Sequence, residues 1–68
     1  MTARDFSDLF KGVVILRRVV EAAGISESAW YAAVNREREL TLDEHTRLRE
    51  ALKEHAREIA TMAKDVKP

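Results

Sequence analysis

The chain has 68 residues, no cysteine, and 12 basic and 12 acidic side chains. So short a chain forms one domain and buries only about 60% of its unfolded surface, which leaves its stability marginal. Neither a disulfide nor a Cys/His metal cluster can compensate, so self-association is expected. Zero net charge counts against a generic nucleic-acid coat, which would be strongly basic, but permits a protein that reads sequence with one local face.

The sequence contains no apolar run near the ~20 residues that span a bilayer. The opening segment, MTARDFSDLF, carries acidic side chains and lacks the apolar core of a signal peptide. We therefore expect a cytoplasmic protein without membrane contact. No cysteine nucleophile or glycine-rich phosphate loop is present, and the chain is too short to enclose a substrate. We expect a non-enzyme that takes no metal, cofactor or small-molecule substrate.

Glycine and proline are scarce, with two glycines and one proline at the last position. Ala, Leu, Glu, Arg and Lys dominate, so an all-α bundle of four to five helices is expected. The first helix is predicted over 3–11, because Phe6, Leu9 and Phe10 recur at helical spacing and form one apolar face.

Gly12 is expected to break this helix, because glycine destabilises helices and favours other backbone conformations. A second helix is then predicted over 14–23, although one continuous helix over 6–23 would keep nearly the same spacing. The inward residues of the second helix are Leu16, Val19, Val20 and Ala23.

The segment after the second helix has the signals of a tight turn and a new helix. Gly24 stands where a left-handed residue usually closes a helix. Ser26 is a predicted N-cap, and Ile25 and Trp30 have the spacing of a hydrophobic staple. The third helix is therefore predicted over 27–36.

The third helix is predicted to have two different faces. Trp30, Ala33 and Val34 share the face that turns to the core. The opposite face carries small or hydrogen-bonding residues, namely Ser28, Ala32 and Asn35, with Tyr31 beside them. Folding does not require a small residue on an outer face, whereas a methyl group there permits close approach to a DNA base edge.

The segment Thr41–Glu44, TLDE, has the pattern of a capping box, so a long helix is predicted over 42–64. Its apolar residues recur with heptad-like spacing: Leu48, Leu52, His55, Ile59, Met62 and Val66. This helix is the predicted dimerisation element, and the residues assigned to the interface are Leu52, His55, Ile59 and Met62.

The stretch GISESAWYAAVNRERELTLDEHTRLREAL, which begins at Gly24, resembles the helix-turn-helix domains of the Cro and lambda-repressor (XRE-type) family. The shared pattern is a glycine, an apolar residue and a polar cap, then a short helix that ends in an apolar pair and Asn, a basic stretch and a capped apolar helix. The resemblance covers 16–52 and implies a helix-turn-helix over about 15–36, whose second helix enters the major groove of DNA.

In that family the first, second and sixth residues of the reading helix contact bases, and here they are Glu27, Ser28 and Ala32. The residue that ends the helix, here Asn35, holds a phosphate. At three positions the chain departs from the family pattern. Val20 replaces a favoured Ala, Leu16 replaces a Gln that binds phosphate and base, and Arg36 replaces a frequent Gly, where it adds a possible phosphate contact.

The resemblance implies a transcriptional repressor that binds its operator as a homodimer. The two reading helices would enter successive major grooves about 34 Å apart. The expected partners are double-stranded DNA and a second copy of the chain. The residues assigned to the DNA interface are Ser26, Glu27, Ser28, Tyr31, Ala32, Asn35, Arg36, Arg38 and Arg17.

The alternative is a protein-interaction module, either a small helical adaptor or an antitoxin-like partner that docks through its long last helix. Zero net charge favours this alternative, whereas the outward row of Ser28, Ala32 and Asn35 favours DNA. Salt dependence separates the two, because phosphate contacts release counterions and apolar contacts do not.

Overall fold

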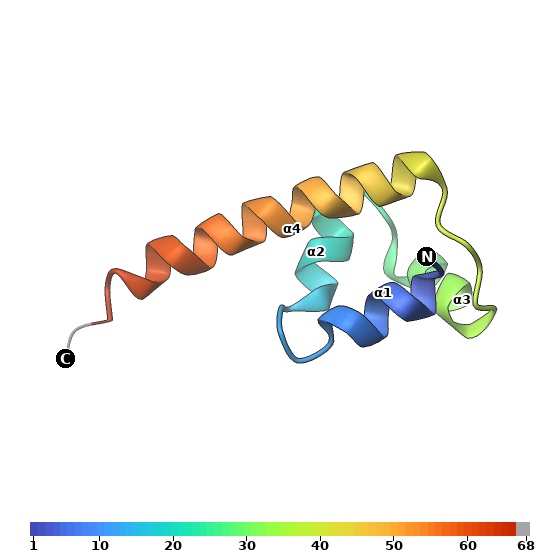
Figure 1. Cartoon of the computed structure of the whole chain (residues 1–68), viewed down its shortest axis with the longest axis horizontal. Coiled ribbons are helices and arrows are strands. Elements are labelled where there is room, and N and C mark those ends of the chain that lie inside the picture. Colours follow the sequence, from blue (N-terminus) through green and yellow to red (C-terminus); the bar gives the residue numbers. More distant parts are fainter. Residues whose placement is uncertain (67–68) are drawn as a thin grey trace.

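The computed structural model describes residues 1–66 and contains four helices in this part of the chain: α1 (Ala3–Phe10), α2 (Leu16–Ala22), α3 (Glu27–Asn35) and α4 (Leu42–Ala63). The first three form a small globule beneath the N-terminal half of α4, and the rest of α4 projects away from it (Figure 1). The molecule is therefore elongated, 45 Å by 20 Å by 19 Å. The expected all-α fold with a long last helix is confirmed.

A capping box that the sequence analysis missed starts α1. The hydroxyl of Thr2 accepts a hydrogen bond from the amide of Asp5, whose carboxylate accepts one from the amide of Thr2. These bonds hold the pKa of Asp5 below its usual value. The buried face of α1 consists of Ala3 and Phe6. The prediction for Leu9 is wrong: its side chain is 58% exposed because it lies to one side of that face.

The chain breaks at Gly12 as predicted, so α1 and α2 are separate helices. Gly12 has a φ of 83°, a conformation that few other residues adopt. The predicted start of α2 at residue 14 is two residues too early. The amide of Val14 bonds to the carbonyl of Phe10, and Ile15 is extended, so helical geometry begins only at Leu16.

The core lies between the helices, with α1 packed on α3 and α2 packed on both α3 and α4. Trp30 is 5% exposed, and its ring meets the ring of Phe6 edge to face, with centroids 5.8 Å apart and an interplanar angle of 84°. Tyr31 is 58% exposed. The predicted phase of the third helix is therefore confirmed. The remaining buried hydrophobic side chains are Ala3, Val19, Val20, Ala23, Ala33, Leu48 and Ala51.

The capping box at the start of α4 is also confirmed: the Thr41 hydroxyl accepts from the amide of Glu44, and the carboxylate of Glu44 accepts from the amide of Thr41. The apolar seam of α4 then divides into two parts. Leu48 and His55 are buried and Leu52 is half-buried, so this part of the seam completes the chain's own core. The later residues of the seam project beyond the globule and are exposed.

His55 joins α4 to the segment before α2. Its Nε2 accepts a hydrogen bond from the backbone amide of Ile15 over 3.4 Å, and its Nδ1 lies 3.7 Å from a carboxylate oxygen of Glu58. Its side chain is 6% exposed. The assignment of His55 to a dimer interface therefore needs correction, because the ring is already enclosed by its own chain.

Candidate nucleic-acid interface

Residues 16–35 form a helix-turn-helix unit whose turn is fixed by its own backbone. The amide of Ile25 bonds to the carbonyl of Val20, and the amide of Gly24 bonds to the carbonyl of Glu21. This pair of bonds is a Schellman motif, and Gly24 takes the left-handed conformation that the motif requires, with a φ of 77°. The predicted role of Gly24 is confirmed.

Ser26 begins the second helix of the unit. Its Oγ accepts a hydrogen bond from the amide of Ala29 over 3.2 Å, as an N-cap does. The hydroxyl oxygen is therefore engaged at the helix start. Among the residues assigned to DNA, Ser26 has a positioning role in this structure.

A side chain from α4 fastens the turn. Nη1 of Arg47 donates a hydrogen bond to the carbonyl oxygen of Ala23 over 2.9 Å, and Nη2 lies 2.9 Å from a carboxylate oxygen of Asp43. A Cβ added to Gly24 would stand 3.2 Å from the same guanidinium. Arg47 thus links the start of α4 to the turn that sets the angle between α2 and α3. The sequence analysis missed it, because nothing in the local pattern distinguishes it from the other arginines of α4.

The outer face of α3 is open to solvent. The side chains assigned to base reading on this helix are all exposed: Glu27, Ser28, Tyr31 and Ala32. Asn35, assigned to a phosphate, is exposed on the same helix. A helix that presents small and hydrogen-bonding side chains outward, and a Trp inward, has the two faces that major-groove reading requires.

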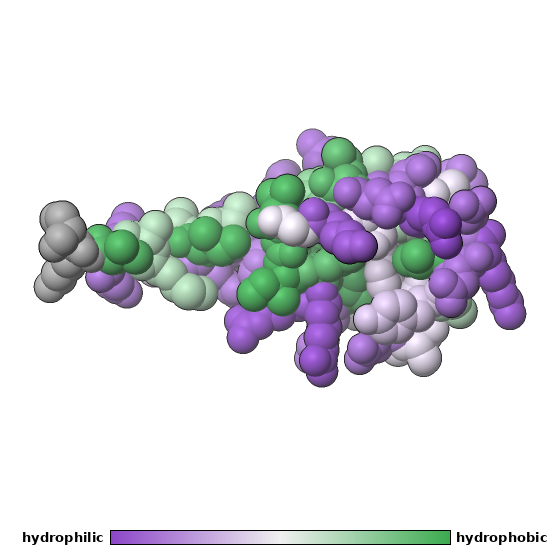
Figure 2. Space-filling view, turned by 90° about the horizontal axis from the view of Figure 1, so that it is seen from below, coloured by the Kyte–Doolittle hydropathy of each residue, from purple (hydrophilic) through white to green (hydrophobic). Residues whose placement is uncertain are grey.

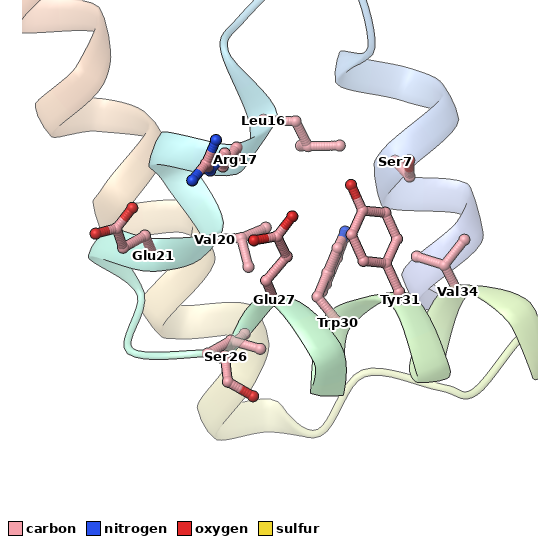
Figure 3. A pocket seen from close by; sticks show the side chains of 11 residues that line it. Ser7, Leu16, Arg17, Val20, Glu21, Ser26, Glu27, Trp30, Tyr31 and Val34 are labelled. Carbon is pink, nitrogen blue, oxygen red and sulfur yellow. The ribbon is translucent and has the colours of Figure 1, made fainter.

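A cavity of about 360 Å³ lies beside this face, between α1, α2 and α3. In Figure 3 the carboxylate of Glu27 and the ring of Tyr31 reach from α3 toward Leu16 and Arg17 at the start of α2. Arg17 is therefore on the same side of the molecule as Glu27 and Tyr31. The rest of the lining consists of Ser7, Val20, Glu21, Ile25, Ser26, Trp30 and Val34.

The arginines near α3 differ in what they contact. Within residues 1–66, Arg17 and Arg36 form no ion pair and no side-chain hydrogen bond, and both are exposed. Their guanidinium groups are free to meet phosphate oxygens. Arg36 is the C-cap of α3, so it stands beside the outer face of that helix.

Arg38 has a different environment. It forms a bidentate ion pair with Glu44, with nitrogen–oxygen distances of 2.9 and 2.7 Å, and also donates to the carbonyl oxygen of Glu39. Hydrogen bonds from Arg38 and from the backbone of Thr41 lower the pKa of Glu44 from 4.5 to about 2. The pair ties the connection after α3 to the first turn of α4. Arg38 therefore stabilises the fold, and its guanidinium is already engaged with Glu44 instead of being available to bind a phosphate.

The connection after α3 contains a second Schellman motif, although no glycine in this part of the sequence indicates one. The amide of Arg38 bonds to the carbonyl of Ala33, and the amide of Glu37 bonds to the carbonyl of Val34. Glu37 therefore occupies the left-handed position, with a φ of 50°. In residues other than glycine, this conformation raises the free energy of the folded chain. The family pattern has a frequent glycine at the position of Arg36. In this chain the left-handed residue is instead the next one, Glu37.

Comparisons with protein-family models, with curated proteins and with solved structures gave no match to this chain. Within residues 1–66 no helix combines the length and the apolar character that crossing a membrane demands.

Proposed function

We propose that the protein is a sequence-specific DNA-binding transcriptional regulator, a repressor that occupies its operator as a homodimer. The observation that carries the proposal is the outer face of α3. Ser28, Ala32 and Asn35 are exposed there on a helix whose opposite side is anchored by buried Trp30. Small outward side chains allow close approach to base edges, which an ordinary solvated helix does not need.

The distribution of charge supports the proposal locally, although the chain is neutral overall. Arg17 and Arg36, which form no ion pair within residues 1–66, flank α3 from the start of α2 and from the end of α3 itself. Phosphate contacts from these side chains position a reading helix without carrying sequence information. Specificity then rests on Ser28, Tyr31 and Ala32, with Glu27 a candidate acceptor for the amino group of cytosine.

The competing proposal is a helical interaction module that binds another protein. The projecting half of α4 favours it, because exposed apolar side chains at one edge of that segment can serve a protein partner. The two functions differ in their salt dependence. DNA binding weakens steeply with salt because counterions are released, whereas an apolar helix contact hardly changes.

The test is Ala32→Glu, compared with Thr61→Glu as a control that adds the same charge on the projecting part of α4. Both positions are exposed, so circular dichroism should show both variants folded. A preferred duplex is first selected from a random pool and then titrated at several salt concentrations. Ala32→Glu should abolish specific binding, because it directs an anion at the groove, whereas Thr61→Glu should bind like the parent. Equal binding by Ala32→Glu and the parent would show that α3 is not in the groove.

A further inference from the structure

The chain exposes more surface than is usual for a folded monomeric protein of the same mass. Its accessible area is 5156 Å² for 7.8 kDa. Monomeric proteins of this mass expose about 4,400 Å² on the usual scaling, so the excess is roughly 800 Å². About 800 Å² is also what each partner contributes to a standard protein–protein interface. Residues 56–66, at the end of α4 and just beyond it, are all exposed and account for part of this excess, because they project away from the globule (Figure 1).

The unpartnered surface is apolar on one side. Ile59, Met62 and Val66 are 45%, 55% and 78% exposed. Ile59 and Met62 lie three residues apart on one face of α4, which ends at Ala63, and Val66 follows in the hydrogen-bonded turns that extend the helix. These three residues are called the stripe below. The stripe does not stop at the globule. Val13 and Ile15, in the connection between α1 and α2, are 72% and 57% exposed. Figure 2 shows hydrophobic surface that runs along the projecting segment and continues onto the underside of the globule.

The spacing between the stripe and the α1–α2 connection determines how two copies could pack. Ile15 lies against His55, because its amide donates to the His55 ring. Val66 is eleven residues further along α4 and the turns that extend it, which is about 16 Å at the helical rise. If two α4 segments cross antiparallel midway along that span, Ile59 of each faces Met62 of the other. Val66 of each then reaches the level of His55, where the other copy presents Ile15 and Val13.

We propose that two copies of the chain associate in this antiparallel way, so that the projecting end of each α4 covers the α1–α2 connection of the other. The arrangement is self-complementary, since each copy supplies both the stripe and its receiving surface, and it therefore closes at two copies. It deepens the homodimer part of the proposed function. It also changes the predicted interface: Ile59 and Met62 remain, whereas Leu52 and His55, which pack within their own chain, are replaced by Val13, Ile15 and Val66.

Charge at the edge of the stripe gives the association a distinct salt response. Glu58 and Asp65 border the stripe on the same edge, seven residues apart. Antiparallel packing brings the Glu58 of each copy near the Asp65 of the other. Salt screens this repulsion, so the association should tighten at higher salt. DNA binding has the opposite response.

The first experiment measures mass by sedimentation equilibrium without DNA, from micromolar to about 0.1 mM chain at low and high salt. The parent should form dimers and no larger species. Ile59→Glu and Met62→Glu should each weaken dimerisation at least tenfold, whereas Thr61→Glu, on the opposite side of the helix, should not. A monomeric parent, growth beyond dimer, or equal effects of all three substitutions would overturn the proposal. Because DNA is absent, failure here is separate from failure of DNA binding.

The second experiment fixes the direction of packing. The chain has no cysteine, so single cysteines report only their own neighbours. Ile15→Cys and Val66→Cys chains are mixed and oxidised. The antiparallel arrangement predicts that the mixed disulfide between the two variants dominates. A parallel arrangement would instead link Val66→Cys chains to one another and would refute this packing. A mixture of Leu42→Cys and Val66→Cys is the matched control and should give little cross-linking, since Leu42 is exposed at the far end of α4.

Discussion

Arg47 donates a hydrogen bond to the carbonyl oxygen of Ala23, 24 residues earlier in the chain. Ala23 is the C-cap of α2, so its carbonyl lacks a partner within the helix. The guanidinium supplies that partner from α4. The long helix therefore does more than cover the core: it holds the end of the first helix of the helix-turn-helix unit in place.

Arg47→Ala should lower the free energy of unfolding by about 1–2 kcal/mol, because a carbonyl at the end of α2 loses a charged donor. Arg49→Ala is the matched control, since Arg49 is exposed and forms no hydrogen bond or ion pair within residues 1–66. The free energy of unfolding of the Arg49→Ala variant should differ from that of the parent by less than about 0.5 kcal/mol. Urea denaturation followed by tryptophan fluorescence gives both values. Equal losses would mean that the Arg47 bond contributes nothing to stability.

The neighbouring aromatic residues of α3 should respond very differently to truncation. Trp30→Ala removes a buried side chain and its contact with Phe6, at a cost of about 3–5 kcal/mol. That loss is comparable to the whole stability of a small domain. Tyr31→Ala removes an exposed ring and should cost less than about 1 kcal/mol. Thermal melts monitored by circular dichroism compare the two, and the reverse order would contradict the assigned faces of α3.

Glu44 should make stability depend on pH in the acidic range. Its pKa in the folded protein is about 2, below the ordinary value of 4.5. A depressed pKa means that the ionised form favours folding. The contribution is complete above about pH 4.5 and is lost as pH falls toward 2. Glu44→Gln should therefore cost about 1–2 kcal/mol at pH 7.

The difference between Glu44→Gln and the parent should shrink as the pH falls toward 2, where the parent carboxylate is protonated as well. Asp8→Asn is a suitable control, because Asp8 is exposed on α1 and forms no side-chain hydrogen bond or ion pair within residues 1–66. Urea melts at several pH values report the difference. A gap between Glu44→Gln and the parent that stays constant down to pH 2 would contradict the role of the Arg38–Glu44 pair.

Glu37 should be a site where glycine stabilises the protein. Its φ of 50° costs a side-chain-bearing residue about 1–2 kcal/mol. The ion pair that Glu37 forms with Arg4 is exposed and contributes little. Glu37→Gly should raise the free energy of unfolding by about 0.5–1 kcal/mol. Glu37→Gln keeps the strained backbone and removes only the charge, so it should not stabilise; a gain with Gln as large as with Gly would exclude backbone strain as the cause.

The features that could be predicted from sequence are those set by nearby residues. The N-caps Ser26 and Thr41 and the turn glycine Gly24 each act over two to four residues, and each is present in the structure. The faces of α3 follow from spacing alone, because Trp30, Ala33 and Val34 recur at three and four residues and so share one side of the helix. The Thr2 capping box is equally local, but it carries Asp5 where the usual pattern has Glu or Gln.

The features that could not be predicted depend on which distant segments meet. The seam of α4 has the same spacing before and after His55, so spacing cannot tell where the globule ends and the projecting segment begins. Arg47 resembles its neighbours until Ala23 is placed 2.9 Å away. Arg38 belongs to a charged run whose pairing with Glu44 requires a particular path of the connection. Glu37 carries no sign of its left-handed backbone, because glycine usually marks such positions.

Arg36 and Arg38 offer a direct comparison, because they are two residues apart and, in the part of the chain that the structure describes, only Arg38 has an ion-pair partner. Arg36 is the C-cap of α3 and its guanidinium has no partner within residues 1–66. Arg38 is held by Glu44 through two hydrogen bonds. If α3 binds DNA, Arg36→Ala should weaken binding to all duplexes alike and reduce the salt slope by about one unit, with stability unchanged. Arg38→Ala should leave the salt slope unchanged and lower stability, because Glu44 loses its partner.

The comparison is made by titrating a labelled duplex at four or more salt concentrations, at a temperature where urea melts show every variant fully folded. Specificity is checked with a scrambled duplex, since a phosphate contact carries no sequence information and Arg36→Ala should keep the ratio of the two affinities. If Arg38→Ala reduces the salt slope and Arg36→Ala does not, the Arg38–Glu44 pair opens on DNA and Arg38 is the phosphate contact. If neither variant changes the slope, the positive charge at the end of α3 plays no part in binding.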